Sequence, residues 1–382
     1  MTLTAGETAG PAATKKRKLT LCGSFGLGNT GDEALPHAIM DLARAHGIGL
    51  EVNLLSRYDE PTLASAIGLG KNSKHRRQEL IGQQCLIIGG GVIEPGPMSV
   101  LFRCAPYIEE LAPSHVTLFA AAVEAGVYYP LASRLRIRRI LRGMGPLLVR
   151  DELSADVLGR LLPHSEIEVV GDAVLWLEPD SAVSRHIEGL DRFVAVSLTG
   201  RWSAPGWYAW ISDQLRRLAE SLDAALVFVP FSWLDHDDRL EHRKVCEVLR
   251  FLYPHVEARP IDEVLCPAQV LGVIRRSTLT VGMRLHACVM SFAQRVPFIA
   301  LAYHPKIYGF AKTVGWENFI IPRRLPQRQT SRAYGYDFGD ITADEQLADV
   351  AAEALRFRSF ERLDELRGRI AKAFLEVLDH GR

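Results

Sequence analysis

The chain has 382 residues, long enough for two domains of ordinary size. It carries 45 Lys and Arg against 45 Asp and Glu, and this zero formal charge argues against a general binder of polyanions such as nucleic acid. No apolar run reaches the roughly 18 residues that a membrane-spanning helix needs.

The first segment, residues 1–17, lacks the apolar centre of a signal peptide and shows no hydrophobic periodicity. We therefore predict a disordered tail. Its basic run, Lys15–Lys18, is interpreted as the solvated approach to the first strand rather than as a nuclear targeting signal.

The six cysteines are scattered, and none forms a C-x-x-C pair. Four of them stand in apolar stretches, where a free cysteine packs as a small hydrophobic side chain. We expect free thiols, no zinc ribbon and a reducing, cytoplasmic setting.

The first half of the chain alternates strand-like and helix-like segments. The expected strands are Lys18–Phe25, Leu50–Ser56, Cys85–Ile93, Val116–Val123, a short one before Arg150, and Ile167–Val174. The expected helices are Asp32–Gly47, Arg134–Gly143 and one ending near Leu162, and residues 68–80 form a polar loop or a short helix. Repeated β-α-β units of this kind predict a mostly parallel sheet with helices on both faces.

After a turn-rich break over residues 177–192 the same pattern restarts. The expected strands are Phe193–Gly200, Ala224–Ser232, Ser277–Met283 and Pro297–Tyr303, and the helices are Trp207–Asp223, Asp238–Tyr253 and Leu285–Val296. We predict an α/β protein with two doubly wound, Rossmann-like domains over residues 18–185 and 186–330, facing a cleft that holds the site. A helical segment over 331–382 follows, and its last helix is expected to pack back across the first domain.

The stretch GLGNTGDEA, Gly26–Ala34, contains the spacing G-x-G-x-x-G. In a dinucleotide-binding protein the helix that follows receives a pyrophosphate, but here Asp32 and Glu33 stand at that position and would repel it. We therefore reject a nicotinamide dehydrogenase. Asn29, Asp32 and Glu33 instead suit the hydroxyl groups of a sugar, with helix capping by Asp32 as the alternative.

A second set of residues lies in VGMRLHA and the later YHPK, between Val281 and Lys306. Arg284 and His286 follow a strand and stand at a helix start, where the dipole and free amides favour anions. Lys306 ends the next strand at the same sheet edge. These residues predict a site for a small, multiply charged anion.

Two further motifs leave alternatives open. Arg150, before Asp151, is either a second guanidinium facing the anion or one member of a salt bridge between layers. The glycines Gly89–Gly91 permit close backbone approach to a ligand or to a neighbouring helix.

Together the motifs GNTGDEA, IIGGG, VRDELS, GDAV, MRLHA and YHPK resemble the polysaccharide pyruvyl transferase family, in that family's order over roughly residues 20–315. The resemblance implies a fold like the two-domain GT-B glycosyltransferases. It also implies transfer of pyruvate from phosphoenolpyruvate onto two hydroxyls of a sugar, which forms a ketal in exopolysaccharide or cell-surface glycan biosynthesis.

The resemblance places phosphoenolpyruvate on Arg284, Leu285, His286 and Arg150, and we add Lys306 from its position. The expected acceptor-binding residues belong to the first domain and are Asn29, Gly31, Asp32, Glu33, Gly90 and Gly91. The catalytic candidates are His286, as acid or phosphate ligand, and Asp32, as hydroxyl contact or base. We expect no metal and no cofactor, with phosphoenolpyruvate as co-substrate.

Two other functions stay open: a nucleotide-sugar glycosyltransferase on the same fold, and a non-catalytic saccharide-binding relative. The expected partners are phosphoenolpyruvate and a saccharide or lipid-linked oligosaccharide, without nucleic acid. The location is cytoplasmic or the inner face of the membrane, and the oligomeric state is open. The basic segment Arg134–Arg142 is either a solvated helix face or a contact with anionic lipid.

Overall fold

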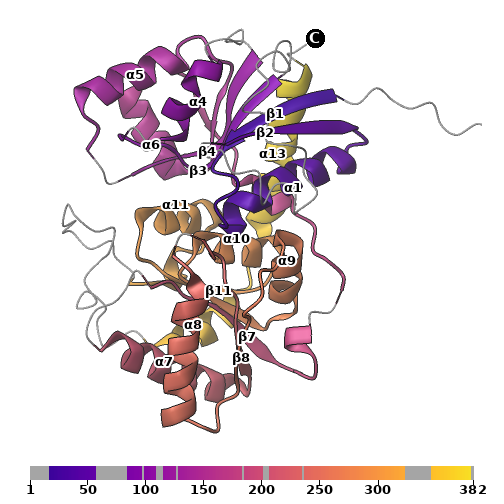
Figure 1. The fold of residues 1–382 in the computed structure, drawn as a ribbon, viewed down its shortest axis with the longest axis vertical. Helices are drawn as coiled ribbons and strands as arrows, with labels where there is room; N and C mark the ends of the chain where they lie inside the picture. Colours follow the sequence, from indigo (N-terminus) through magenta and orange to yellow (C-terminus); the bar gives the residue numbers. More distant parts are fainter. Residues whose placement is uncertain are drawn as a thin grey trace, which may run out of the picture.

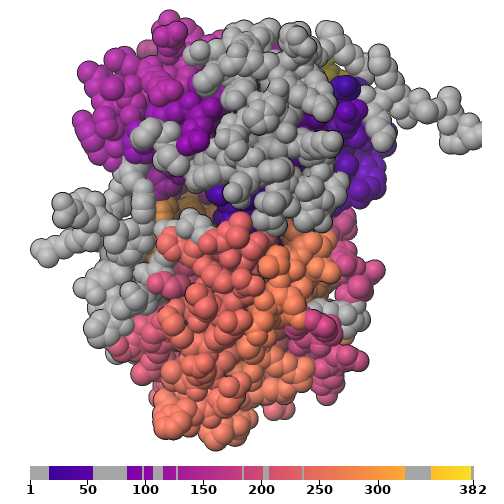
Figure 2. All heavy atoms as spheres, in the orientation of Figure 1, coloured from indigo at the N-terminus to yellow at the C-terminus, as the bar shows by residue number. Residues whose placement is uncertain are grey.

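A computed structural model describes the chain over residues 17–56, 84–96, 99–108, 115–125, 128–182, 185–200, 206–234, 236–322 and 346–379. The predicted tail up to residue 16 and the predicted polar loop over residues 68–80 lie outside these ranges. Two lobes are stacked along the long axis of the molecule (Figures 1 and 2).

The first domain contains a six-stranded parallel sheet in the order β2-β1-β3-β4-β5-β6. Its strands are β1 (Arg17–Gly23), β2 (Leu50–Ser56), β3 (Gln84–Ile93), β4 (Val116–Val123), β5 (Leu147–Val149) and β6 (Ile167–Val169). Its helices are α1 (Thr30–Ala45), α4 (Val100–Ile108), α5 (Leu131–Leu141) and α6 (Glu152–Leu161). The chain winds outward from β1 in both directions, so the crevice between β1 and β3 opens at their carboxyl ends.

The second domain contains another six-stranded parallel sheet, in the order β12-β11-β10-β7-β8-β9. Its strands are β7 (Phe193–Ser197), β8 (Ala225–Phe228), β9 (Ala258–Pro260), β10 (Leu279–Gly282), β11 (Phe298–Leu301) and β12 (Ile320–Ile321). Its helices are α7 (Trp207–Leu222), α8 (Asp238–Leu252), α9 (Pro267–Arg276), α10 (Leu285–Ala293) and α11 (Pro305–Val314). The two sheets confirm the predicted pair of doubly wound domains, and the second crevice lies between β7 and β10.

The central strands have continuous apolar runs instead of an alternation of apolar and polar residues. All eight residues of β4 are buried, because helices cover both faces of its sheet. The central strands therefore deliver their side chains to the core, whereas the edge strands β6 and β9 are only partly buried.

The C-terminal helices α12 (Leu347–Phe357) and α13 (Glu361–Asp379) connect the two domains. Figure 1 shows α13, in yellow, beside β1 of the first domain. Phe374 of α13 packs edge-to-face against Phe119 of β4, with ring centroids 6.1 Å apart. The last helix thus returns to the first domain, as the sequence indicated. No helix in the described part of the chain is long and apolar enough to cross a bilayer.

The cysteines differ from expectation. Cys22 of β1 and Cys104 of α4 form a disulfide, so the prediction of free thiols is wrong for this pair. The pairing arises because α4 packs against the sheet beside β1. Their separation of 82 residues carries no signal in the sequence. The remaining cysteines are free, and they are Cys85, Cys246, Cys266 and Cys288.

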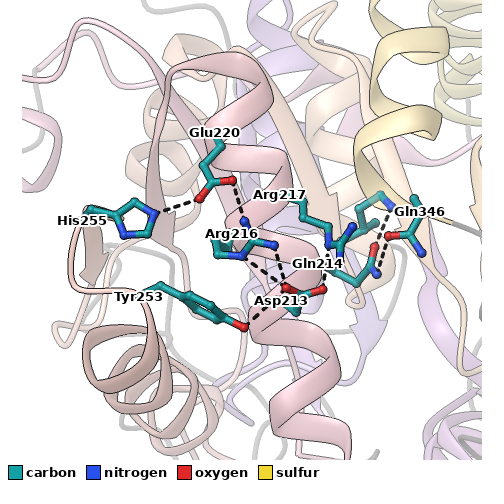
Figure 3. A network of polar contacts seen from close by, with 9 residues as sticks. Asp213, Gln214, Arg216, Arg217, Glu220, Tyr253, His255 and Gln346 are labelled. Carbon is teal, nitrogen blue, oxygen red and sulfur yellow. Dashed lines mark hydrogen bonds and ion pairs between the residues drawn. The ribbon is translucent and has the colours of Figure 1, made fainter.

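A polar network on α7 holds the start of α12 (Figure 3). The buried Gln214 donates from Nε2 to Oε1 of Gln346 at 2.9 Å, and its own Oε1 accepts the backbone N–H of Leu347 at 2.9 Å. On the neighbouring outer turn of α7, Arg217 pairs with Asp213 at 2.7 Å in a half-exposed position.

Replacing Gln214 by leucine is expected to lower the free energy of unfolding by about 2 kcal/mol, because the buried N–H of Leu347 loses its acceptor. Chemical denaturation would measure this. The matched control is Arg217→Leu on the same helix, which removes only an exposed ion pair and should have a much smaller effect. Equal losses in both variants would contradict this account.

Candidate functional site

A cavity of about 390 Å³ lies where the carboxyl ends of the two sheets face each other. Both domains line it. The first domain contributes Ser24, Leu27, Asn29, Asp32, Gly90, Gly91, Glu94, Ala122, Val123, Glu124, Ala125, Arg150, Asp151, Leu153 and Ser154. The second contributes Ser232, His236, Arg284, Leu285, His286, Tyr303, His304 and Lys306.

Charge is divided between the two walls of this cavity. The acidic lining residues all come from the first domain, and they are Asp32, Glu94, Glu124 and Asp151. The basic ones come from the second domain, and they are Arg284, Lys306 and the histidines His236, His286 and His304. Among the described lining residues Arg150 is the one cation of the first domain. One wall therefore suits an anion and the other suits hydroxyl groups.

Arg284 follows β10 and is held from behind by Asp238, the first residue of α8. Its Nη2 donates to Oδ1 of Asp238 at 2.6 Å, and its Nε lies 3.1 Å from Oδ2. Asp238 is completely buried and also accepts the N–H groups of Phe231 and Ser232. Burial raises the pKa of Asp238, an effect that the charge of Arg284 partly offsets. This fork fixes the direction of the guanidinium at the cavity wall.

Helix α10 presents an open N-terminus to the cavity. Three other helices that begin there are capped by their own side chains: Asn29 accepts from Gly31 in α1, Asp151 from Ser154 in α6, and His304 from Lys306 in α11. Within the described residues, α10 has no side-chain cap. Its first amides and its dipole are therefore available to an anion, next to Arg284.

His286 stands in the first turn of α10 and reaches across to the first domain. Its Nε2 lies 3.5 Å from Oδ2 of Asp172, which is 2% exposed. Burial raises the pKa of Asp172, but the His286 ring and the charge of Arg150 outweigh this and lower it overall. Gly31 of α1 packs against the ring, since a Cβ at that position would lie 1.8 Å from Nδ1 of His286.

Arg150 follows β5 and is buried, with 3% of its surface exposed. Its Nε donates to Oδ2 of Asp151 at 2.9 Å, and its Nη1 lies 3.9 Å from Oδ2 of Asp172. A Cβ at Gly90 would lie 3.9 Å from Nη1 of Arg150 and 3.6 Å from Oδ1 of Asp32. Arg150 is thus both an internal salt-bridge member and part of the cavity wall, so the two interpretations of the sequence are compatible.

A second histidine–carboxylate pair joins the domains. Nε2 of His304 lies 2.8 Å from Oε1 of Glu124, which follows β4. Burial raises the pKa of Glu124, but His304, Lys306 and Arg150 together outweigh this and lower it overall. Both residues of this pair line the cavity.

The loop after β1 positions the acidic wall. Asn29 caps α1 by accepting the Gly31 N–H at 3.2 Å, and its Nδ2 donates to Oδ2 of Asp32 at 2.8 Å. Asp32 therefore does not cap the helix and instead lines the cavity. Glu33 does not line the cavity, and its Oε1 accepts the N–H of Gly26 at 2.7 Å. It supports the loop from behind.

Glu33 makes stability depend on pH. Burial, with a smaller contribution from Asp32, raises its pKa from 4.5 to about 7. The folded chain holds this proton between these values while the unfolded chain releases it, so stability falls as pH rises through that window. Glu33→Gln should therefore gain up to about 3 kcal/mol relative to the native chain between pH 5 and pH 9. Denaturant unfolding across that range tests this, and parallel curves would disprove it.

The structure gathers most predicted site residues around one cavity: Asn29, Asp32, Gly90, Gly91, Arg150, Arg284, Leu285, His286 and Lys306. Gly31 and Glu33 do not line it. Gly31 supports the His286 ring, and Glu33 supports the loop before α1.

Among the polar residues of the site, Glu124, Asp172 and Asp238 were not proposed as binding or catalytic residues from the sequence. Two of them carry a readable signal. Glu124 is a lone acid that ends an apolar strand, and Asp172 stands in the GDAV motif. Asp238 has none, because it lies 46 residues from Arg284 among other acids.

The side chains that could coordinate a metal ion are dispersed. In the described part of the chain no group of three or more His, Cys, Asp or Glu side chains is arranged to hold one. The carboxylates of the site face arginine and histidine instead.

Solved structures with the same architecture include nucleotide-sugar enzymes. The UDP-GlcNAc 2-epimerase of Neisseria meningitidis bound to UDP-GlcNAc has a TM-score of 0.55 at 12% identity, covering 95% of this chain and 99% of that one. The Methanocaldococcus jannaschii UDP-GlcNAc 2-epimerase, in complex with UDP-GlcNAc and UDP, gives 0.54 at 14%, with 95% and 99% covered. At such identities the likeness shows the fold alone, and it confirms the GT-B-like arrangement.

No curated protein matches the chain significantly. The family comparison is informative, because polysaccharide pyruvyl transferase matches residues 29–305. That span begins at Asn29, just before α1, ends at the start of α11, and includes both strands of the second crevice, β7 and β10. The chain belongs to the polysaccharide pyruvyl transferase family.

Proposed function

We propose that this chain transfers pyruvate from phosphoenolpyruvate to two hydroxyls of a saccharide, forming a ketal in the synthesis of an exopolysaccharide or cell-surface glycan. The observation that carries the proposal is the convergence of Arg284, His286, Lys306 and Arg150 on one cavity beside the uncapped start of α10. Membership of the family supports the transferase class.

The basic wall fits the donor. Phosphoenolpyruvate carries a carboxylate and a phosphate on a small enol, and two separated guanidinium groups match two separated anions. Arg284 lines the cavity from the second domain and Arg150 from the first, and the uncapped start of α10 lies next to Arg284. Lys306 adds a third positive charge at the same sheet edge.

In the proposed reaction His286 donates a proton to the methylene carbon, which makes the central carbon electrophilic. A sugar hydroxyl adds at that carbon, and its proton goes to a base. The phosphate then leaves and takes up the proton held by the base, and the second hydroxyl attacks the same carbon, closes the ketal and returns a proton to His286. Asp172 orients the His286 ring from the other domain, at 3.5 Å.

The acidic wall fits the acceptor. Asp32 is held by Asn29 with its carboxylate at the cavity, where it can accept a hydrogen bond from a hydroxyl and take its proton. Gly90 and Gly91 leave room beside it, because they carry no side chains. Under this proposal the basic wall binds the donor and the acidic wall binds the sugar. The proposed location of the protein is the cytoplasm or the inner face of the membrane.

Thermal melting of the native chain with phosphoenolpyruvate tests the proposal. At about 100 times the dissociation constant the ligand should stabilise the chain by roughly 2.7 kcal/mol. Inorganic phosphate and pyruvate, which each lack one half of the donor, serve as matched controls and should shift melting less. A shift with UDP and none with phosphoenolpyruvate would instead support a nucleotide-sugar enzyme.

A further inference from the structure

Helix α5 carries an unusual concentration of positive charge for a chain with no net charge. Residues 125–150 contain no Asp or Glu, and the arginines of this stretch are Arg134, Arg136, Arg138, Arg139, Arg142 and Arg150. All but Arg150 belong to α5 or its C-cap. Packing of the core does not account for these arginines, since only three residues of α5 are buried, all of them apolar. The arginines of α5 do not line the cavity either.

Within the described residues, the arginines of α5 have no acidic partners. Arg136 lies over the ring of Phe102, 4.4 Å from its centroid, and Arg138 donates to the carbonyl oxygen of Leu161 at 2.7 Å. Within the described part of the chain, no carboxylate lies within ion-pair distance of any arginine of α5. In the same residues, the side chains of Arg134, Arg139 and Arg142 form no hydrogen bond to another side chain. The positive charge of these arginines is therefore not neutralised by a described carboxylate and can interact with an anionic partner outside the chain.

Large apolar side chains stand exposed on the same helix. Tyr128, just before α5, is 81% exposed, Leu131 is 65% exposed and Leu135 is 54% exposed. Leu131, Leu135, Arg139 and Arg142 follow one another at helical spacing, so they form a single stripe. We call Tyr128, Leu131, Leu135, Arg139 and Arg142, together with the flanking Arg134, the α5 face. Helix α5 itself lies on the outer side of the first domain, at the upper left of Figure 1.

The apolar end of the α5 face adjoins the cavity. Ser133 donates to the carbonyl oxygen of Pro95 at 2.6 Å, one residue beyond the lining residue Glu94. Tyr129 donates to the carbonyl oxygen of Glu124, another lining residue, at 2.9 Å. The start of α5 is thus anchored to the acidic wall, and whatever covers the α5 face is held near the acceptor side of the site.

We propose that the α5 face binds an anionic membrane surface and so brings the cavity to a lipid-linked saccharide acceptor, a refinement that rests on the proposed function. An aromatic and two leucines beside a row of arginines is the pattern of a helix lying at the boundary between headgroups and acyl chains. The arginines match the negative surface charge of such a membrane. A nucleic acid would use the arginines but give no role to Tyr128, Leu131 and Leu135.

Flotation of the full chain with vesicles tests this proposal. Vesicles of phosphatidylcholine with about one third phosphatidylglycerol should carry the native protein, and phosphatidylcholine alone should not. Arg134→Gln/Arg139→Gln/Arg142→Gln should weaken partitioning more than tenfold, since each charge near the surface contributes about fivefold. Leu131→Ser/Leu135→Ser should also weaken it.

The matched control is Arg250→Gln/Arg275→Gln/Arg276→Gln, an equal charge change at exposed positions of the second domain, which should alter binding by less than twofold. Equal losses in both triple variants, equal binding to duplex DNA, or no flotation of the native chain would overturn the proposal. Melting with phosphoenolpyruvate, run on the same proteins, keeps the two ideas separate. Flotation without a ligand shift rejects the proposed function, and a ligand shift without flotation rejects the membrane surface.

Discussion

Arg284→Ala is expected to weaken binding of phosphoenolpyruvate by roughly hundredfold or more, because a charged partner of a doubly anionic ligand is removed from a largely buried wall. Isothermal titration or ligand-dependent melting would measure the loss. The same change should lower the free energy of unfolding by about 3–5 kcal/mol, since Asp238 is left completely buried without its cation.

A second variant separates these two effects. Arg284→Ala/Asp238→Asn removes the stranded charge, while the asparagine oxygen can still accept the N–H groups of Phe231 and Ser232. This double variant should recover much of the stability and none of the ligand binding. Full binding in the double variant would show that Arg284 is structural and that the donor lies elsewhere.

Gly31→Ala is the other change with a large expected effect. The new Cβ would stand 1.8 Å from Nδ1 of His286, so the ring must move away from the position where it faces Asp172. Displacing a catalytic group by about 1 Å can cost roughly hundredfold in rate. We expect kcat to fall by about that factor while the melting temperature changes modestly, as overpacking costs about 1–3 kcal/mol.

The control is another glycine-to-alanine change in a helix. Gly368 of α13 has an ordinary backbone conformation, and a Cβ at that position would have no atom within 4 Å. Gly368→Ala should therefore leave kcat unchanged and raise stability by up to about 1 kcal/mol. Unchanged kcat in Gly31→Ala would remove His286 from the chemistry. A rate loss shared with Gly368→Ala would indicate a general effect.

The fold was largely predictable because strand and helix periodicity is local. The predicted strand Val116–Val123 matches β4 residue for residue, and the predicted helix starting at Trp207 is α7. Short elements were missed: β9, with three residues, and α9, whose apolar residues are interrupted by Gly272, give little periodic signal. The Cys22–Cys104 disulfide was missed because spacing in sequence says nothing about which helix lies on which strand.

The site was predictable in position but not in its internal contacts. Parallel strands bring their carboxyl ends to one edge, so Asp32, Arg150 and Arg284 could be placed at the cleft from their order after strands. Their partners depend on contacts that form only in the folded chain. Arg284, at the start of α10, forms an ion pair with Asp238 at the start of α8. His286 of the second domain lies beside Asp172 of the first. The order of residues in the sequence does not predict contacts between residues that are this far apart.

The two histidine–carboxylate pairs each take one member from either half of the protein: His286 with Asp172, and His304 with Glu124. Neither half contains a complete pair. A chimera that joins the first half of this chain to the second half of a relative would inherit unmatched members unless both positions were exchanged together. The halves are therefore expected to evolve as a unit, and recombination at the turn-rich break near residue 185 should yield active enzymes only between parents that share both pairs.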